Sequence, residues 1–412
     1  MMSKSILAEK YLGWLPDHWE RCQLGDLCLK ILDGVHQTPT YVEEGIPFLR
    51  VTDLQNSLID LSKVKRISKE EFEEITKNNK PEKGDILLSK NGTIGLSKVI
   101  DWDWDFATFV SLALLKLPKR NCKIRADFLC RLFESEVIWQ QIRNYSKTGT
   151  VTNLHLEEIR KLWVPLPPKP EQDRIAAILG TWDEAIAKTQ ALIERKERRQ
   201  IGIALKFFEK LIKEQHQVVL AKDIFEPISE KNAPDMPLLA VTQDQGVIPR
   251  DLLDRRVVMP EGNVDGYKVV RTGDFVISLR SFEGGLEYSN YEGLISPAYT
   301  VIRAVQPINH DFYRHYFKSR SFIGRLNPLI FGIRDGKQIP FRDFSAVKVP
   351  YPSMEIQESL ADVLNEVDKE LKATREYLDL LQNQKKGLMQ KLLTGEWPVA
   401  AAQTPQLQEA AG

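Results

Sequence analysis

The sequence contains no long apolar run, no secretion signal and no unusual composition. No stretch approaches the ~18 apolar residues that a membrane span needs. Met1–Leu15 lacks a basic region followed by an apolar core, so we expect no signal peptide. Hydrophobic residues make up 42% of the chain and charged residues 28%, which is typical of a globular protein and excludes a disordered one. We therefore expect a cytoplasmic protein with no membrane partner.

The chain also lacks net charge and closely spaced cysteines. Lysine plus arginine and aspartate plus glutamate both number 57. This balance argues against a protein that coats nucleic acid indiscriminately. It is compatible with a sequence reader, because local basic loops can supply phosphate contacts. No cysteine pair has the spacing of a structural zinc site. We expect reduced cytosolic thiols at Cys22, Cys28, Cys122 and Cys130.

Catalytic motifs are missing as well. Gly332–Lys337 reads GIRDGK, one residue short of a phosphate-binding loop and without the following Ser or Thr. Glu194-Arg195-Lys196 resembles the Glu-x-Lys of nucleases, but it lies in the middle of an expected helix and has no partner acid on a strand. There is no methyl-donor motif, no Gly-x-Ser-x-Gly and no His-Glu-x-x-His. We expect no catalytic residue, no metal and no cofactor in this chain.

The second half of the sequence repeats the first at an offset of about 185 residues. The matches keep the same order and nearly constant spacing, and a period this long indicates a duplicated module rather than a solenoid. Val164-Pro165-Leu166-Pro167 recurs as Val349-Pro350-Tyr351-Pro352, and Gly84-Asp85 recurs as Gly273-Asp274.

Each repeat follows one plan. Short strands are expected at 47–51, 85–88 and 109–117, and again at 237–241, 274–278 and 299–304. One amphipathic helix follows in each repeat, at 126–144 and 311–326, because apolar residues recur there at helical spacing. A Gly-containing loop comes next, and prolines at 165–170 and 350–352 end each repeat.

A long helical segment follows each proline stop, at 171–214 and 355–393. Apolar residues recur in alternating steps of four and three, which indicates a coiled-coil seam. The seam residues are Ile175, Leu179, Trp182, Ile186 and Ile193 in the first segment and Leu360, Leu364, Val367, Leu371 and Leu378 in the second.

The seams could pack on their own modules or against each other. A helix of about 40 residues spans roughly 60 Å, longer than one small module. Pairing the two helices would bury both seams. The predicted fold is α+β, with two similar mixed α/β domains separated by two long helices in an antiparallel coiled coil with pseudo-two-fold symmetry. That symmetry matches the approximate two-fold symmetry of DNA duplexes.

Two loops in each repeat are candidates for DNA contact. Lys, Arg, Asn, Gln, Ser and Thr are the side chains that hold phosphates and read base edges, and glycine permits close approach of the backbone. The loop after the Gly-Asp strand contains Lys90, Asn91 and Thr93, and in the second repeat Arg280 and Ser281. The loop after the amphipathic helix contains Lys147, Thr148, Thr150 and Asn153, and in the second repeat Arg334, Lys337 and Gln338. The alternative is that these are ordinary surface loops, which favour the same residue types.

Three stretches resemble the specificity-subunit family of Type I restriction–modification systems. Gly13–Trp19 (GWLPDHW) is similar to the opening motif of these subunits, and 165–179 (PLPPKPEQDRIAAIL) to the start of their first long helix. Leu388–Trp397 (LMQKLLTGEW) resembles the end of their second helix. The resemblance covers about residues 12–397. The chain departs from it at Ser353–Ile356, where the family often has Pro-x-x-Glu-Gln, although Gln357 keeps the glutamine.

The resemblance implies a non-catalytic subunit that binds double-stranded DNA. Each of two target recognition domains would read half of a bipartite target, and the long helices would space them and bind two modification (methyltransferase) subunits. S-adenosylmethionine, ATP and Mg would reside on partners, and restriction (motor–nuclease) subunits would complete the complex. The expected boundaries are 1–165 and 216–350 for the recognition domains, 166–215 and 351–397 for the spacer helices, and 398–412 for a C-terminal tail. The alternative is a coiled-coil scaffold or tethering protein that does not bind DNA.

Overall fold

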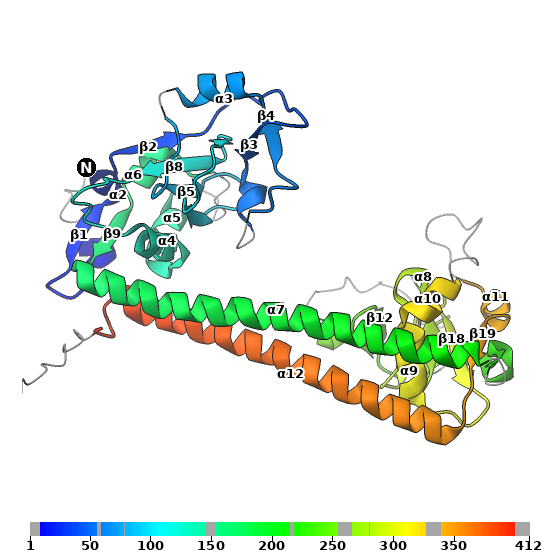
Figure 1. Cartoon of the computed structure of the whole chain (residues 1–412). Helices are drawn as coiled ribbons and strands as arrows, with labels where there is room; N and C mark the ends of the chain where they lie inside the picture. The colour runs from blue at the N-terminus through cyan, green and yellow to red at the C-terminus, as the bar shows by residue number, and fades with distance from the viewer. Residues whose placement is uncertain are drawn as a thin grey trace, which may run out of the picture. The chain divides into compact units, whose positions relative to one another are not determined.

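The computed structural model describes residues 9–55, 59–77, 79–145, 153–214, 218–231, 233, 235–253, 266–279, 281–326 and 339–399. The chain divides into two units. Unit 1 contains Met1–Ala187 and Asp379–Gly412, and unit 2 contains Lys188–Leu378. Each unit holds one sequence repeat and about half of each long helix (Figure 1). We call the part of unit 1 before residue 169 the first module, and residues 218–353 the second module.

The first module combines short strands with short helices. Its strands are β1 (Glu20–Gln23), β2 (Lys30–Asp33), β3 (Ile46–Leu49), β4 (Lys65–Ile67), β5 (Ile86–Ser89), β6 (Ser97–Val99), β7 (Ala107–Thr108), β8 (Leu112–Lys116) and β9 (Trp163–Leu166). Its helices are α2 (Leu24–Leu27), η1 (Val51–Leu54), α3 (Lys69–Thr76), α4 (Ala126–Glu134), α5 (Glu136–Asn144) and α6 (Leu156–Arg160).

The second module follows the same plan. Its strands are β10 (Val218–Leu220), β11 (Phe225–Ile228), β12 (Leu239–Thr242), β13 (Gly246–Pro249), β14 (Lys268–Val270), β15 (Phe275–Ile277), β16 (Glu287–Tyr288), β17 (Gly293–Ile295), β18 (Thr300–Ala304) and β19 (Lys348–Pro350). Its helices are η3 (Ala221–Asp223), η4 (Arg250–Leu252), α8 (Ser281–Gly284), α9 (His310–Lys318), α10 (Arg320–Leu326) and α11 (Phe341–Ser345).

Both modules are built on the same four-stranded antiparallel sheet. Its order is β2-β8-β5-β6 in the first module and β11-β18-β15-β16 in the second. The repeated Gly-Asp motif stabilises this sheet: Asp85 pairs with Lys116 at 2.9 Å, and Asp274 receives two hydrogen bonds from Arg303, both of 2.7 Å. The recurrence of the motif therefore has a structural cause.

The single amphipathic helix predicted in each repeat is broken into two, which corrects the sequence prediction. Ser135 separates α4 from α5, and Ser319 separates α9 from α10, both with extended backbone (φ −88°, ψ 153° and φ −76°, ψ 149°). Each serine hydroxyl donates to the carbonyl three residues earlier, at 2.6 Å. Serine competes for backbone groups in this way, so it ends a helix that its apolar neighbours would continue.

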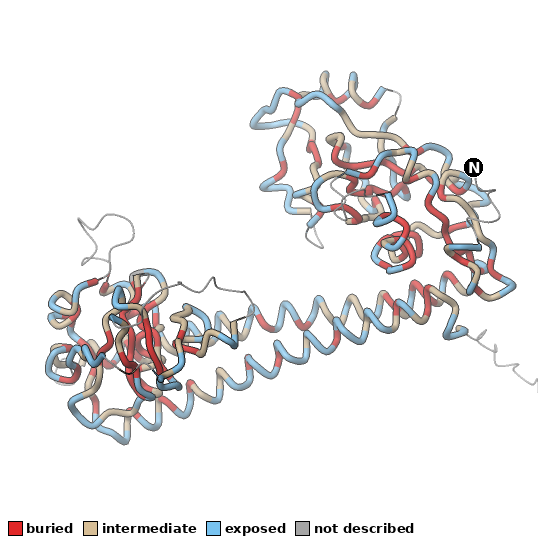
Figure 2. The backbone as a smooth tube through the Cα atoms, turned by 180° about the vertical axis from the view of Figure 1, so that it is seen from behind, coloured by how far each residue is buried: buried red, intermediate tan, exposed pale blue. Residues whose placement is uncertain are grey.

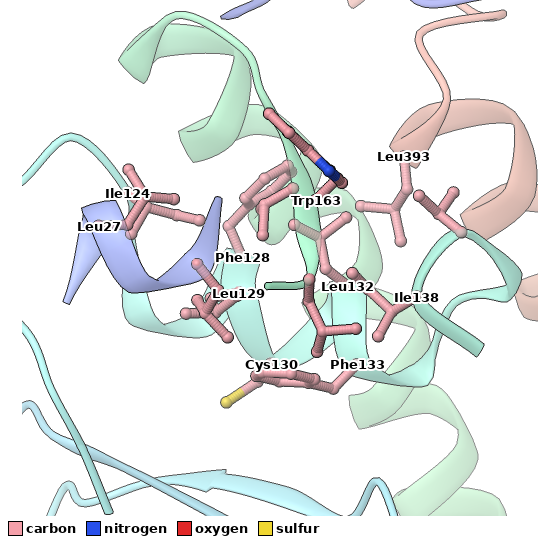
Figure 3. Close-up of a cluster of buried hydrophobic side chains, with 14 of the residues drawn as sticks. Leu27, Ile124, Phe128, Leu129, Cys130, Leu132, Phe133, Ile138, Trp163 and Leu393 are labelled. Atoms are coloured by element: carbon pink, nitrogen blue, oxygen red, sulfur yellow. The ribbon is translucent and has the colours of Figure 1, made fainter. Parts of the chain in front are cut away.

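Helices and strands enclose a separate core in each unit. The buried residues are red in Figure 2. In unit 1 this core contains Phe128 and Phe133 of α4 and extends to Leu393 at the end of the second long helix (Figure 3). In unit 2 it is rich in aromatic rings, including Phe225, Phe275 and Phe317. Burying each such side chain contributes about 1.5–3 kcal/mol.

The two long helices are α7 (Lys169–Lys213) and α12 (Met354–Leu393). Glu171 lies in the first turn of α7 and lysines lie in its last turn, which complements the helix dipole. Gly395 follows α12 with φ 70°, the left-handed conformation that commonly ends helices at glycine. A Cβ at Gly395 would lie 2.6 Å from Pro16, so the opening motif and the end of α12 pack closely.

Within each unit, the segments of α7 and α12 lie side by side and run antiparallel (Figure 1). In unit 1, Asp183 contacts Lys385 at 2.7 Å. In unit 2, Lys196 donates to the Thr374 hydroxyl at 2.9 Å, and Gln200 donates to Asp368. The numbering falls along one helix as it rises along the other, which is the arrangement of an antiparallel coiled coil.

Every residue of the predicted seam is buried or partly buried. Ile175, Leu179, Ile193, Leu364 and Leu371 are buried, each at most 9% exposed. The others are partly buried: Trp182, Ile186, Leu360, Val367 and Leu378.

A buried glutamine fixes the start of each long helix. Gln172 is fully buried. Its Oε1 accepts from the Arg125 amide at 2.8 Å, and its Nε2 donates to the carbonyls of Lys123 and Pro167 at 2.9 and 2.8 Å. Gln357 makes the equivalent contacts with the Asn309 amide and the Pro352 carbonyl, both at 2.9 Å. One side chain thus joins the proline stop, the long helix and the segment before the module helix.

Substituting Gln172 by alanine should lower the free energy of unfolding by about 2–4 kcal/mol, because each orphaned buried backbone group costs about 1–3 kcal/mol. Urea denaturation followed by tryptophan fluorescence measures the loss. Gln190→Ala, at an exposed position on the same helix, is the matched control and should change stability by less than about 0.5 kcal/mol. Equal midpoints for the two variants would contradict the assignment.

Candidate nucleic-acid interface

The first predicted loop leaves the sheet at Ser89 as a tight turn. The Ser89 hydroxyl accepts from the Leu96 amide at 2.8 Å, and the Ser89 carbonyl accepts from the Gly95 amide at 3.0 Å. Gly95 has φ 87°, and a Cβ there would lie 2.6 Å from the Trp139 ring. The loop is therefore held against α5, and Thr93 is exposed on it.

Lys90 does not lie on the surface of this loop. Its side chain is 6% exposed, and its ammonium lies 3.1 Å from Asp33 of β2. A buried charge without a partner is strongly disfavoured, so this ion pair holds the lysine inward. We therefore leave Lys90 out of the proposed DNA contacts.

The two predicted loops of the first module meet. Asn91 forms an isolated antiparallel bridge with Asn153, and the Leu154 amide donates to the Lys90 carbonyl at 2.8 Å. Asn153 is exposed, like Thr93. Among the described residues, the Asn91 Oδ1 is buried without a hydrogen-bond donor. Segments about 60 residues apart in the chain thus form one polar surface.

Only Ser281 of the predicted second-module residues can be placed. It is fully buried, and its hydroxyl accepts from the Ser278 amide at 2.7 Å, so we leave it out of the proposed contacts as well. The remaining predictions lie outside the described residues: Lys147, Thr148 and Thr150 in the first module, and Arg280, Arg334, Lys337 and Gln338 in the second.

Lys318, which no sequence pattern singles out, holds the loop between β15 and β16 of the second module in place. Its ammonium donates to both carboxylate oxygens of Glu287 at 2.6 Å and to the carbonyls of Gln243 and Gly284 at 3.0 Å. The lysine thereby joins the end of α9 to β16, to α8 and to the β12–β13 turn. Burial raises the pKa of Glu287, and the ammonium of Lys318 opposes this rise. The available sequence signal was a glutamate at the first position of the short strand β16, between Leu286 and Tyr288.

No group of three or more His, Cys, Asp or Glu side chains among the described residues could hold a metal ion. None of the helices in the described ranges is both long and apolar enough to cross a membrane.

Known proteins share sequence similarity with both the first module and the whole chain. A family model described as "Type I restriction modification DNA specificity domain" matches residues 16–197. The type I restriction enzyme MjaVIII specificity subunit of Methanocaldococcus jannaschii is 25% identical over 420 residues, spanning 93% of each chain. Residues 16–197 of this chain thus match the DNA specificity domain of type I restriction–modification systems, and most of the chain is similar to specificity subunits.

Solved structures show the same fold. The S subunit of a Type I restriction–modification system from M. genitalium is similar with a TM-score of 0.51 and 16% identity, over 93% of this chain and 97% of that one. A chain from a structure of complex assembly and conformational transition in a type I R-M system has a TM-score of 0.56 and 15% identity, over 93% and 99%. The matched specificity domain comprises most of the first module and α7 as far as Glu197. The second module repeats its sheet order.

Lys318→Met should destabilise the second module by about 2–4 kcal/mol, because it leaves the buried Glu287 carboxylate unpaired. Solvent reaches the lysine position and lowers this cost. The loss should be smallest below pH 4.5, the ordinary pKa of glutamate, and should grow as the pH rises and the carboxylate ionises. Urea denaturation between pH 4 and 8 measures it.

Lys318→Met/Glu287→Gln provides the control, since it removes both charges and should recover part of the loss. A deficit for Lys318→Met that does not vary with pH would argue against a role for this ion pair.

Proposed function

We propose that this specificity subunit reads a bipartite double-stranded DNA target, with one half-site bound by each module. The supporting observation is the duplication: both modules are built on a four-stranded sheet of the same strand order. Because the modules differ in sequence, the two half-sites can differ. The zero net charge fits a protein that contacts DNA through local loops rather than through a uniformly basic surface.

In the first module we assign DNA contact to the surface formed by Thr93 and Asn153. Both side chains are exposed, and both carry groups suited to base edges or phosphates. The Asn91–Asn153 bridge joins the two loops that bear them. Rigid attachment to β5 and α5 would keep these groups in place before DNA binds, which reduces the entropy cost of association.

The long helices supply the spacer and the partner surface in this proposal. Two modification subunits carrying S-adenosylmethionine would bind the chain, and restriction subunits using ATP and Mg would join the full complex. Methylation and cleavage would then belong to the partners, and this chain would decide where they act. A scaffold without a DNA role remains the alternative; zero net charge is its one supporting observation.

Lengthening both helices tests the spacer role. We expect seven residues inserted after Ala187 and seven after Leu378 to preserve the seam, because seven residues are one coiled-coil repeat. At 1.5 Å per residue and 3.4 Å per base pair, the unread spacer should grow by about three base pairs. Methylation mapping of DNA from cells that co-express the modification subunit gives the spacer length directly.

The lengthened chain must co-purify with the modification subunit for this result to count. The same insertion in α7 alone is the control, and it should disrupt the complex because the seam loses register. An unchanged spacer in an intact complex would refute the role of the helices. A complex that binds and methylates DNA without any sequence preference would favour the scaffold.

Thr93→Ala/Asn153→Ala should weaken binding to the cognate duplex by tenfold or more, because each base-edge contact contributes about 1–3 kcal/mol of discrimination. Gel-shift titration of the complex with its modification subunits measures the change. The loss should persist with duplexes altered in the half-site that the second module reads. It should be absent with duplexes altered in the half-site that the first module reads. Asn383→Ala, at an exposed position on α12, should leave affinity unchanged.

A further inference from the structure

A polar contact joins the first module to both long helices in unit 1. Asp183 of α7 forms ion pairs with Arg131 of α4 and, at 2.7 Å, with Lys385 of α12. Glu134 of α4 completes the group, 3.2 Å from Lys385 and 3.7 Å from Arg131. These four charges connect three helices through side chains that are 14–40% exposed.

Unit 2 contains an aspartate at the equivalent position. Asp368 lies on α12, 185 residues after Asp183. It accepts a hydrogen bond from Gln200 of α7 and lies 3.8 Å from the Nδ1 of His315 on α9. Gln200 occupies the position equivalent to Lys385, and His315 the position equivalent to Arg131. One module helix and both long helices therefore meet at a carboxylate in each unit.

The partners of the two carboxylates differ in charge. In unit 1 they are an arginine and a lysine. In unit 2 Gln200 is neutral, and burial lowers the pKa of His315, which favours its neutral form. Asn365 supports this second contact, since its Oδ1 lies 2.8 Å from the His315 Nε2 and accepts from Arg314 at 2.8 Å. Asp311 accepts from the Asn365 amide at 2.9 Å.

These polar contacts fix the position and rotation of a module on the helix pair, which apolar packing alone does not. Burial of a seam depends on area and has no direction, so it tolerates a small slide or rotation. Charge-assisted hydrogen bonds need defined geometry, and each carboxylate is contacted from the module helix and from the opposite long helix together. A slip of one residue moves a module by 1.5 Å along the helix and turns it by about 100°.

We propose that Asp183 and Asp368 are positioning residues, each of which fixes one recognition module on the helix pair and so sets the permitted spacing between half-sites. This inference rests on the proposed bipartite function. Asp183 and Asp368 touch no DNA in this scheme. They act through the orientation of the module that carries the DNA-contact loops.

The test uses the complex with its modification subunits and synthetic duplexes bearing both half-sites at the cognate spacer, or with one base pair added or removed. Methylation rates give the discrimination between spacers. Asp183→Asn should raise the relative rate on mis-spaced duplexes about tenfold, equivalent to about 1.4 kcal/mol. Discrimination against single-base changes within a half-site should stay unchanged. Asp26→Asn, at an exposed position on α2, is the matched control.

A double variant that changes the side chains around Asp183 separates a positioning role from a general effect on stability. Arg131→His/Lys385→Gln gives Asp183 the partners that Asp368 has, so it should keep spacer discrimination close to that of the unaltered protein. Asp368→Asn is the independent variant in unit 2, and it decides the question if Asp183→Asn fails to fold.

The outcomes distinguish the two proposals. Unchanged spacer discrimination in folded Asp183→Asn and Asp368→Asn overturns the positioning role. Loss of half-site and spacer discrimination together also overturns it, because that pattern indicates general damage. An unaltered complex with no spacer preference at all refutes the bipartite function instead.

Discussion

The packing of α7 against α12 is the interaction on which each module's core depends. In unit 1, Ile175 and Leu179 of α7 and Leu392 of α12 belong to the same buried cluster as Phe128 of the module. In unit 2, Phe208 of α7 and Leu364 of α12 do the same for the aromatic core. Residues from distant parts of the chain thus complete each core. A module without both helices would expose apolar surface that water disfavours.

Polar side chains make these apolar contacts specific. Gln172 and Gln357 bind backbone groups that would otherwise be buried without partners. Their position at the start of each long helix links the direction of that helix to the module before it. Asp183 and Asp368 make a second connection about eleven residues later. Satisfied buried polar contacts of this kind select one arrangement among many that would bury similar area.

The two modules share a frame but differ in the chemistry near their loops. The buried pair of Lys90 and Asp33 in the first module is not repeated at the equivalent position of the second, where Leu279 stands in place of the lysine. The second module instead uses Lys318 to hold its loop. A shared sheet with different loop supports suits a DNA specificity domain, because the sheet stays stable while the contact surface changes.

The sequence alone determined the duplication, the proline boundaries and the helical seam, because these depend on patterns that repeat along one chain. Lys90 and Ser281 were expected at the surface because lysine and serine usually lie there, but both are buried. The sequence also missed the helix breaks at Ser135 and Ser319, where one hydroxyl outweighs an apolar pattern. The Asn91–Asn153 bridge, the Lys318 contacts and the aspartate junctions depend on groups far apart in the chain. Only the tertiary structure decided these, because a partner for a polar atom is chosen by distance in space and not by spacing in sequence.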